Sequence, residues 1–164
     1  MLSESDLNIV KIANGYLAQV CGRANFEYAV PLRELAEEEN ISLLQVDLAQ
    51  CSAMDSTFMG VLTMFALKLR RRDGVVELLN ASEVLQKLLS DLGVHKLFKF
   101  SSGDCSADGC QVGLNAKSGL ETAETVVEAH EALTEADESN WKKFEQVIRL
   151  GRQDADRLRR EQQQ

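Results

Sequence analysis

The segment 53–62 constrains the fold more than any other, because a strand-like apolar run ends there and a helix-like one begins. Asp55, Ser56 and Thr57 lie at the junction. The first backbone N–H groups of a helix have no partners within the helix, and they form the positive end of its dipole. The segment therefore predicts a strand followed by a helix, with two hydroxyl groups at a position that favours anions such as phosphate.

The rest of the first hundred residues alternates between strand and helix patterns. Two β-prone runs open the chain and are separated by Asn14-Gly15, a dipeptide that favours the tight turn of a hairpin. We expect strands at 8–13, 16–21, 42–49, 75–79 and 96–100, and helices at 26–39, 56–72 and 82–92. This order predicts an α/β fold, with a mixed sheet opened by a hairpin and helices packed on it.

The last third of the chain separates its charges into two blocks. Residues 118–141 contain seven acidic and no basic side chains, whereas residues 142–160 contain seven basic and three acidic ones. Such blocks attract each other or bind different partners. Both have helical apolar spacing, and we expect a helical hairpin folded back on the preceding domain; a homodimer through these C-terminal helices is the alternative. The expected divisions are a domain, a linker and a helical C-terminal extension: 1–103, 104–119 and 120–164.

Composition excludes several classes of function. The 164 residues carry a formal net charge of -8, which argues against binding of nucleic acid. No apolar run approaches the length of a membrane span and the start lacks a positive region, so we expect a cytoplasmic protein without a membrane segment. Cys105 and Cys110 could form a disulfide or hold a metal, but free thiols are favoured in a reducing compartment. We therefore expect no metal, no cofactor and no role for the cysteines.

The junction also carries a family resemblance. Asp55-Ser56-Thr57-Phe58-Met59-Gly60 resembles the Asp-Ser-Ser/Thr-Gly-Leu-Gly segment of STAS domains, the family of bacterial anti-sigma factor antagonists. Residues 88–98 resemble the family's last helix, its Leu-Gly turn and its last strand, so the resemblance covers about 8–103. It implies a STAS-like mixed sheet. It also implies that Ser56 is the phosphorylated residue, with Thr57 as a second hydroxyl.

Two positions depart from the family pattern. Phe58 replaces a glycine, which narrows the approach to Ser56, and Asn25 replaces an acid in the loop after the second strand.

The side of the second helix that faces away from the sheet is too apolar to be only solvated, which favours a contact with a partner. Burial of this side under the C-terminal segment is the equally weighted alternative. The expected partner-binding residues are Asn25, Asp55, Thr57, Phe58, Met59, Gly60, Thr63 and Leu67.

The resemblance implies a protein-binding switch with no catalytic residues of its own. The unphosphorylated protein would bind an anti-sigma factor kinase, phosphorylation of Ser56 would release it, and a serine phosphatase would reset it. A phosphate on a surface that a partner has buried costs several kcal/mol, roughly orders of magnitude in affinity. A second hypothesis is a constitutive scaffold subunit of a signalling or transport complex, in which Asp55-Ser56-Thr57 only caps a helix.

An enzyme is the third hypothesis. A hydrolase would need a nucleophile with a base within hydrogen-bond distance. No Gly-x-Ser-x-Gly elbow and no phosphate-binding glycine loop is present. Neither His95 nor His130 has a reason in the sequence to approach Ser56.

Overall fold

The computed structural model describes residues 6–105, 110–111 and 118–164. Its sheet has six strands in the order β5-β4-β3-β2-β1-β6. Strands β2 to β5 run parallel, and β1 is antiparallel to both β2 and β6. The predicted mixed sheet is therefore confirmed. The strands are β1 (Asp6–Ile12), β2 (Gly15–Ala24), β3 (Leu43–Met54), β4 (Val75–Leu79), β5 (Lys99–Ser101) and β6 (Cys110–Gln111).

The opening hairpin is confirmed, with its turn one residue earlier than Asn14-Gly15. Ile12 pairs with Gly15, so the turn consists of Ala13 and Asn14, and Asn14 has a φ of 73°. Gly15 instead begins β2, where a Cβ would overlap the carbonyl oxygen of Leu43 on the neighbouring strand. The glycine at this position permits close approach of two strands.

Five α-helices accompany the sheet in the described residues: α1 (Phe26–Leu35), α2 (Ser56–Arg70), α3 (Glu83–Asp91), α4 (Gly119–Ala136) and α5 (Asn140–Gln162). The helix α1 ends four residues before the predicted Glu39, because the terminal run of glutamates opposes the helix dipole. The predicted last strand begins with a 3₁₀ turn at His95–Leu97, so β5 is shorter than expected. Strand β6 lies within the predicted linker.

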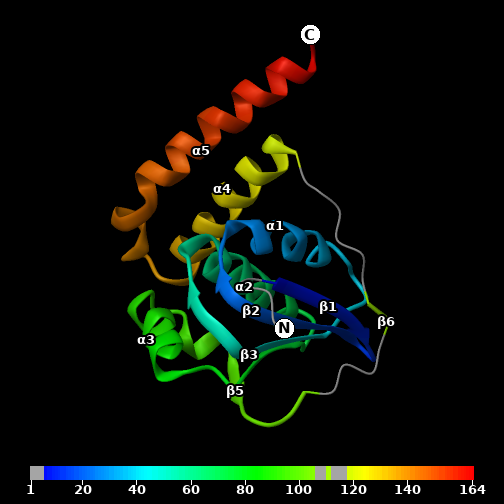
Figure 1. Cartoon of the computed structure of the whole chain (residues 1–164). Helices are drawn as coiled ribbons and strands as arrows, with labels where there is room; N and C mark the ends of the chain where they lie inside the picture. Colours follow the sequence, from blue (N-terminus) through cyan, green and yellow to red (C-terminus); the bar gives the residue numbers. More distant parts are fainter. Residues whose placement is uncertain (1–5, 106–109, 112–117) are drawn as a thin grey trace.

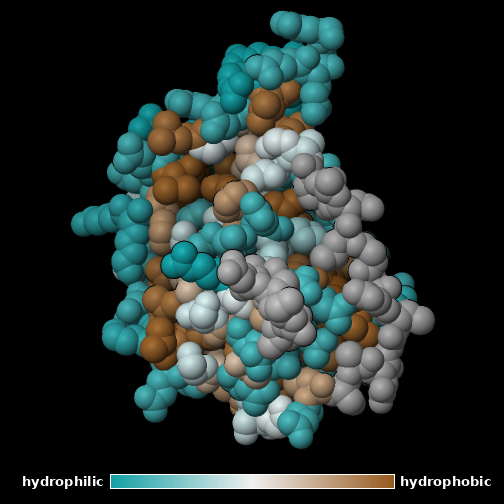
Figure 2. All heavy atoms as spheres, in the orientation of Figure 1, coloured by the Kyte–Doolittle hydropathy of each residue, from teal (hydrophilic) through white to brown (hydrophobic). Residues whose placement is uncertain are grey.

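The C-terminal extension forms the expected helical hairpin, which here denotes α4 and α5 together. It packs back on the preceding domain as an additional layer: α4 crosses α2 and also contacts α1, and α5 packs on α4 as the outermost helix (Figure 1). The outer side of α5 is largely hydrophilic (Figure 2). The hydrophobic core includes Phe58 and Leu62 of α2 together with Ala129 and Leu133 of α4. Helix α2 is thus covered by the sheet and by α4.

Candidate functional site

Asp55 organises the start of two helices. It is the N-cap of α2, where its Oδ1 accepts a 2.8 Å hydrogen bond from the backbone N–H of Phe58. Its Oδ2 accepts a 2.9 Å bond from the backbone N–H of Phe26, the first residue of α1. Asn25 caps α1 through a 2.9 Å bond from the N–H of Glu27 to its Oδ1. Asp55 therefore holds the starts of α1 and α2 together, which places Ser56 beside both.

We expect Asp55→Ala to lower the free energy of unfolding by about 1–3 kcal/mol, because a cap and a second backbone N–H both lose their acceptor. Asp55→Asn should cost less, since its amide oxygen can still cap α2 while only the bond to α1 is lost. Urea unfolding of the two variants measures the difference. Equal losses would contradict the double role of this carboxylate.

Ser56 is hydrogen-bonded to a histidine from the C-terminal extension. Its Oγ lies 2.8 Å from Nε2 of His130 in α4, and Nδ1 of the same ring lies 2.7 Å from the carbonyl oxygen of Val126. Because a carbonyl only accepts, Nδ1 carries a proton. In the neutral ring Nε2 is then the acceptor, and the Ser56 hydroxyl donates to it. The bond joins the first residue of α2 to the middle of α4.

His130 is 2% exposed, whereas Ser56 is partly exposed. Burial lowers the pKa of His130, opposed by the hydrogen bond to Val126 and by the charge of Asp55. The ring of Phe144 in α5 lies edge-on to the imidazole, with centroids 4.9 Å apart. His130 is therefore enclosed by the helical hairpin and by the start of α2, in surroundings that favour its neutral form.

This burial predicts a pH dependence. A histidine released to water regains its ordinary pKa of about 6.5, so below that pH the unfolded state binds more protons than the native state. The contribution of His130 to the free energy of unfolding is complete above about pH 6.5. It decreases as the pH falls from there toward the lowered pKa of the native state. We expect acidification from about pH 7.5 to 5.5 to destabilise the wild type more than His130→Gln, in which no imidazole titrates. Urea unfolding at both pH values measures this, with His95→Gln as the control. An equal pH response of the wild type and His130→Gln would contradict it.

The structure covers much of the predicted partner face. Helix α4 crosses α2 at Gly60, where a Cβ would lie 2.7 Å from the Cβ of Ala129 and would overlap its backbone carbonyl. Met59 and Thr63 are buried in the same crossing, and Thr63 Oγ1 donates to the carbonyl oxygen of Met59. The alternative that the C-terminal segment covers this side is what the structure shows. Partner contacts by these residues would require α4 to move.

The remaining predicted site residues lie in different surroundings. Phe58 is fully buried in the core and Thr57 is buried, whereas Leu67 is partly exposed. Asn25 and Asp55 line an open cavity of about 250 Å³ at the start of α1 and α2, together with Arg23, Ala24, Ala53 and Met54. This cavity reaches Asp55, the residue that precedes Ser56.

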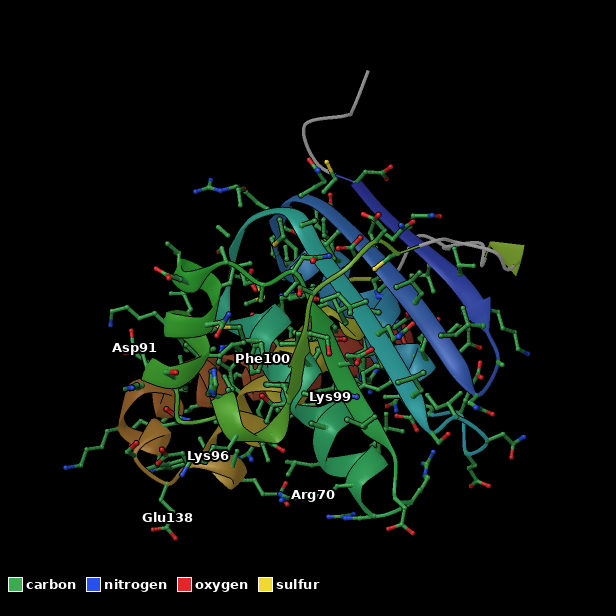
Figure 3. All side chains as sticks on the ribbon, turned by 90° about the horizontal axis from the view of Figure 1, so that it is seen from below. Arg70, Asp91, Lys96, Lys99, Phe100 and Glu138 are labelled. Atoms are coloured by element: carbon green, nitrogen blue, oxygen red, sulfur yellow. The ribbon has the colours of Figure 1, made fainter. Side chains whose placement is uncertain are left out.

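Polar contacts also hold the helical hairpin on the domain. Arg33 of α1 binds Glu128 of α4 through two hydrogen bonds of 2.6 and 2.8 Å. At the other end, Asn140 donates to the carbonyl oxygens of Leu92 and Leu133, both at 2.8 Å. Figure 3 shows this end from below, with Asp91 at the end of α3 and Glu138 between α4 and α5 labelled.

The sequence did not indicate that His130 contacts Ser56. Its only signal was a histidine among the apolar side chains on one side of the predicted helix, a pattern more typical of packing than of a site. The pairing with Ser56 supplies the base that the enzyme hypothesis lacked. The described residues include no cluster of His, Cys, Asp and Glu suited to a metal. Within the part of the chain that the structure describes, Cys51 and Cys105 are in no disulfide.

The sheet order and the placement of the helices define an α/β domain with a mixed sheet. Residues 27–103 match the family model of the STAS domain. This match confirms the resemblance to STAS domains noted in the sequence, for the part of the chain that the family model covers. A comparison with curated protein sequences found no significant match. Across the described residues, no helix combines the length and apolar character needed to cross a membrane.

Solved structures resemble the same part of the fold. The anti-sigma factor antagonist SpoIIAA in its unphosphorylated form matches with a TM-score of 0.53 and 14% sequence identity, over 60% of this chain and 89% of that chain. The Bacillus cell fate determinant SpoIIAA in its phosphorylated form matches with a TM-score of 0.49 and 16% identity, over 61% of this chain and 91% of that chain. The first match shows the fold, and it covers nearly all of SpoIIAA while leaving two fifths of this chain outside it.

Proposed function

We propose that this protein is a phosphorylation-controlled binding switch of the anti-sigma factor antagonist type. In this proposal the unphosphorylated protein binds a kinase-type anti-sigma factor, the kinase phosphorylates Ser56, and a serine phosphatase reverses the modification. Thr57 is the less favoured acceptor because its side chain is buried. The protein itself catalyses no reaction.

The observation that carries the proposal is the position of Ser56. It is the first residue of a helix, it is partly exposed, and it directly follows Asp55, which lines an open cavity with Asn25. The positive end of the helix dipole tolerates an added phosphate locally. A partner that contacts this cavity would meet about two additional negative charges after phosphorylation.

Two measurements test the proposal. Mass spectrometry of the protein from its own cell should find phosphate on Ser56 in some growth states. In pull-downs from the same cells, Ser56→Ala should retain a protein that mass spectrometry identifies as a kinase-type ATPase, and Ser56→Glu should lose it. Ser52→Glu is the control, because Ser52 is exposed on β3 a few residues before the site. Absence of phosphate in all growth states, with equal capture by both Ser56 variants, would exclude the switch.

A constitutive scaffold is the second candidate, and the covering of α2 by α4 favours it. If the helical hairpin never leaves α2, then Met59, Gly60 and Thr63 are core residues and Ser56 only donates to His130. A scaffold would keep its partner with either substitution at Ser56. The same pull-down therefore separates the two candidates.

A further inference from the structure

The bond between Ser56 and His130 makes the hydroxyl of the proposed switch part of the contact that docks α4. The 2.8 Å between Oγ and Nε2 leaves no room for a phosphoryl group between these atoms. One helical turn further along α2, the crossing at Gly60 is too close for even an additional methyl group. A small local shift of α4 therefore does not make room for a phosphoryl group between Ser56 and His130.

The charge of a phosphate on Ser56 would also oppose docking of α4. The Asp55 carboxylate adjoins Ser56 and already acts on His130, so a phosphate on Ser56 would place a second anion beside it. His130 is buried and its surroundings favour the neutral ring, which with a proton on Nδ1 offers no donor at Nε2. A phosphate held against His130 loses water without gaining a cation there, which is unfavourable, whereas the start of α2 by itself tolerates an anion.

The helical hairpin is also separable from the family fold. The STAS match ends at residue 103, before α4 begins, and SpoIIAA reaches a similar fold with only 60% of this chain in the alignment. The contacts that hold the helical hairpin include the ion pair of Arg33 with Glu128 and the hydrogen bonds of Asn140, in addition to apolar packing. Undocking would uncover Met59, Gly60 and Thr63 without removing a strand from the sheet.

We propose that phosphorylation of Ser56 undocks the helical hairpin from α2, with His130 as the residue that couples the two. This inference rests on the proposed function, because it takes Ser56 as the modified residue, and it adds a conformational step to it. The unphosphorylated surface consists of the cavity at the start of α1 and α2 together with the docked α4. Phosphorylation changes the shape of that surface as well as its charge, so a partner selective for the docked form is released.

Hydrogen–deuterium exchange on purified full-length protein tests this without any partner. Phosphoserine incorporated at position 56 should accelerate exchange in residues 119–136 by about tenfold or more, whereas β4 and α3 keep their protection. Ser56→Ala removes the hydrogen bond without adding charge, so it should accelerate exchange in α4 less than phosphoserine does. Phosphoserine at position 52 is the matched control and should leave α4 protected.

Two results would overturn the inference, and a third would leave the decision to a further variant. Unchanged or increased protection of α4 with phosphoserine at position 56 would mean that the phosphate is accommodated, for example by a protonated His130. Equal acceleration with phosphoserine at 52 would mean that the effect does not pass through His130. Loss of protection throughout the sheet would mean global unfolding, and Ser56→Asp at lower temperature must then open α4 alone for the inference to survive. The proposed function fails separately. If phosphoserine at position 56 accelerates exchange in α4 of the purified protein but no phosphate is found on Ser56 in cells, the proposed function is excluded and the coupling between Ser56 and α4 remains.

Discussion

Gly60→Ala is expected to displace α4 from α2 while the sheet remains folded. The new methyl group would meet the backbone of Ala129, which cannot rotate away as a side chain can. Overpacking of this kind costs about 1–3 kcal/mol, and it exceeds the ~1 kcal/mol that alanine adds to helix stability relative to glycine. Hydrogen–deuterium exchange should show α4 losing protection by about tenfold, with β3 and β4 unchanged.

Gly119→Ala is the matched control for this substitution. The same methyl group at the start of α4 would lie 3.8 Å from Cδ1 of Leu158, an ordinary contact. This variant should keep or slightly increase the protection of α4. Equal behaviour of the two alanine variants would contradict the close crossing at Gly60.

Phe58→Ala is expected to have the largest effect on stability, a loss of about 3–5 kcal/mol in the free energy of unfolding. Phe58 is 0% exposed and lies among the core side chains under α2, so its removal leaves a cavity. Phe26→Ala is the control, because Phe26 also begins a helix but is 44% exposed. Urea unfolding should separate the two variants by at least 2 kcal/mol, roughly the difference between a buried and an exposed side chain.

A small effect of Phe58→Ala would contradict its place in the core. The expected large effect would have a functional consequence, since Phe58 is one of the residues predicted to bind a partner. A side chain enclosed in the core supports the shape of the site from beneath. It also leaves the open cavity at Asn25 and Asp55 unobstructed, although Phe58 replaces a glycine of the family pattern.

The sequence predicted the domain well because its signals are local. The junction at Asp55 marks the start of α2 to the residue, since a capping side chain and a change of periodicity coincide there. The turn after Ile12 was predicted one residue late, because Asn14 alone adopts the positive φ and Gly15 serves strand packing instead. Strand β6 has two residues, too few for any periodicity.

The site was predicted only in part, because its second half comes from a distant segment. Ser56 and His130 are 74 residues apart, and no spacing rule connects them. The side of α2 that faces away from the sheet is apolar, as the sequence indicates. This apolar character fits both contact with an external partner and burial under a helix of the same chain. Only the path of the chain shows that α4 occupies this side.

The contacts around Ser56 form a network that connects α1, α2 and α4 to one another. Asp55 joins α2 to the start of α1, Arg33 joins α1 to Glu128 of α4, and His130 joins α4 back to Ser56. Interactions in one network are generally not additive. In a double-mutant cycle, Arg33→Ala and His130→Ala together should therefore reduce the hydrogen-exchange protection of α4, expressed as a free energy, by an amount that differs from the sum of the two single losses. A double loss equal to that sum would contradict a connected network. A substitution at Arg33 would then also change how strongly His130 holds Ser56.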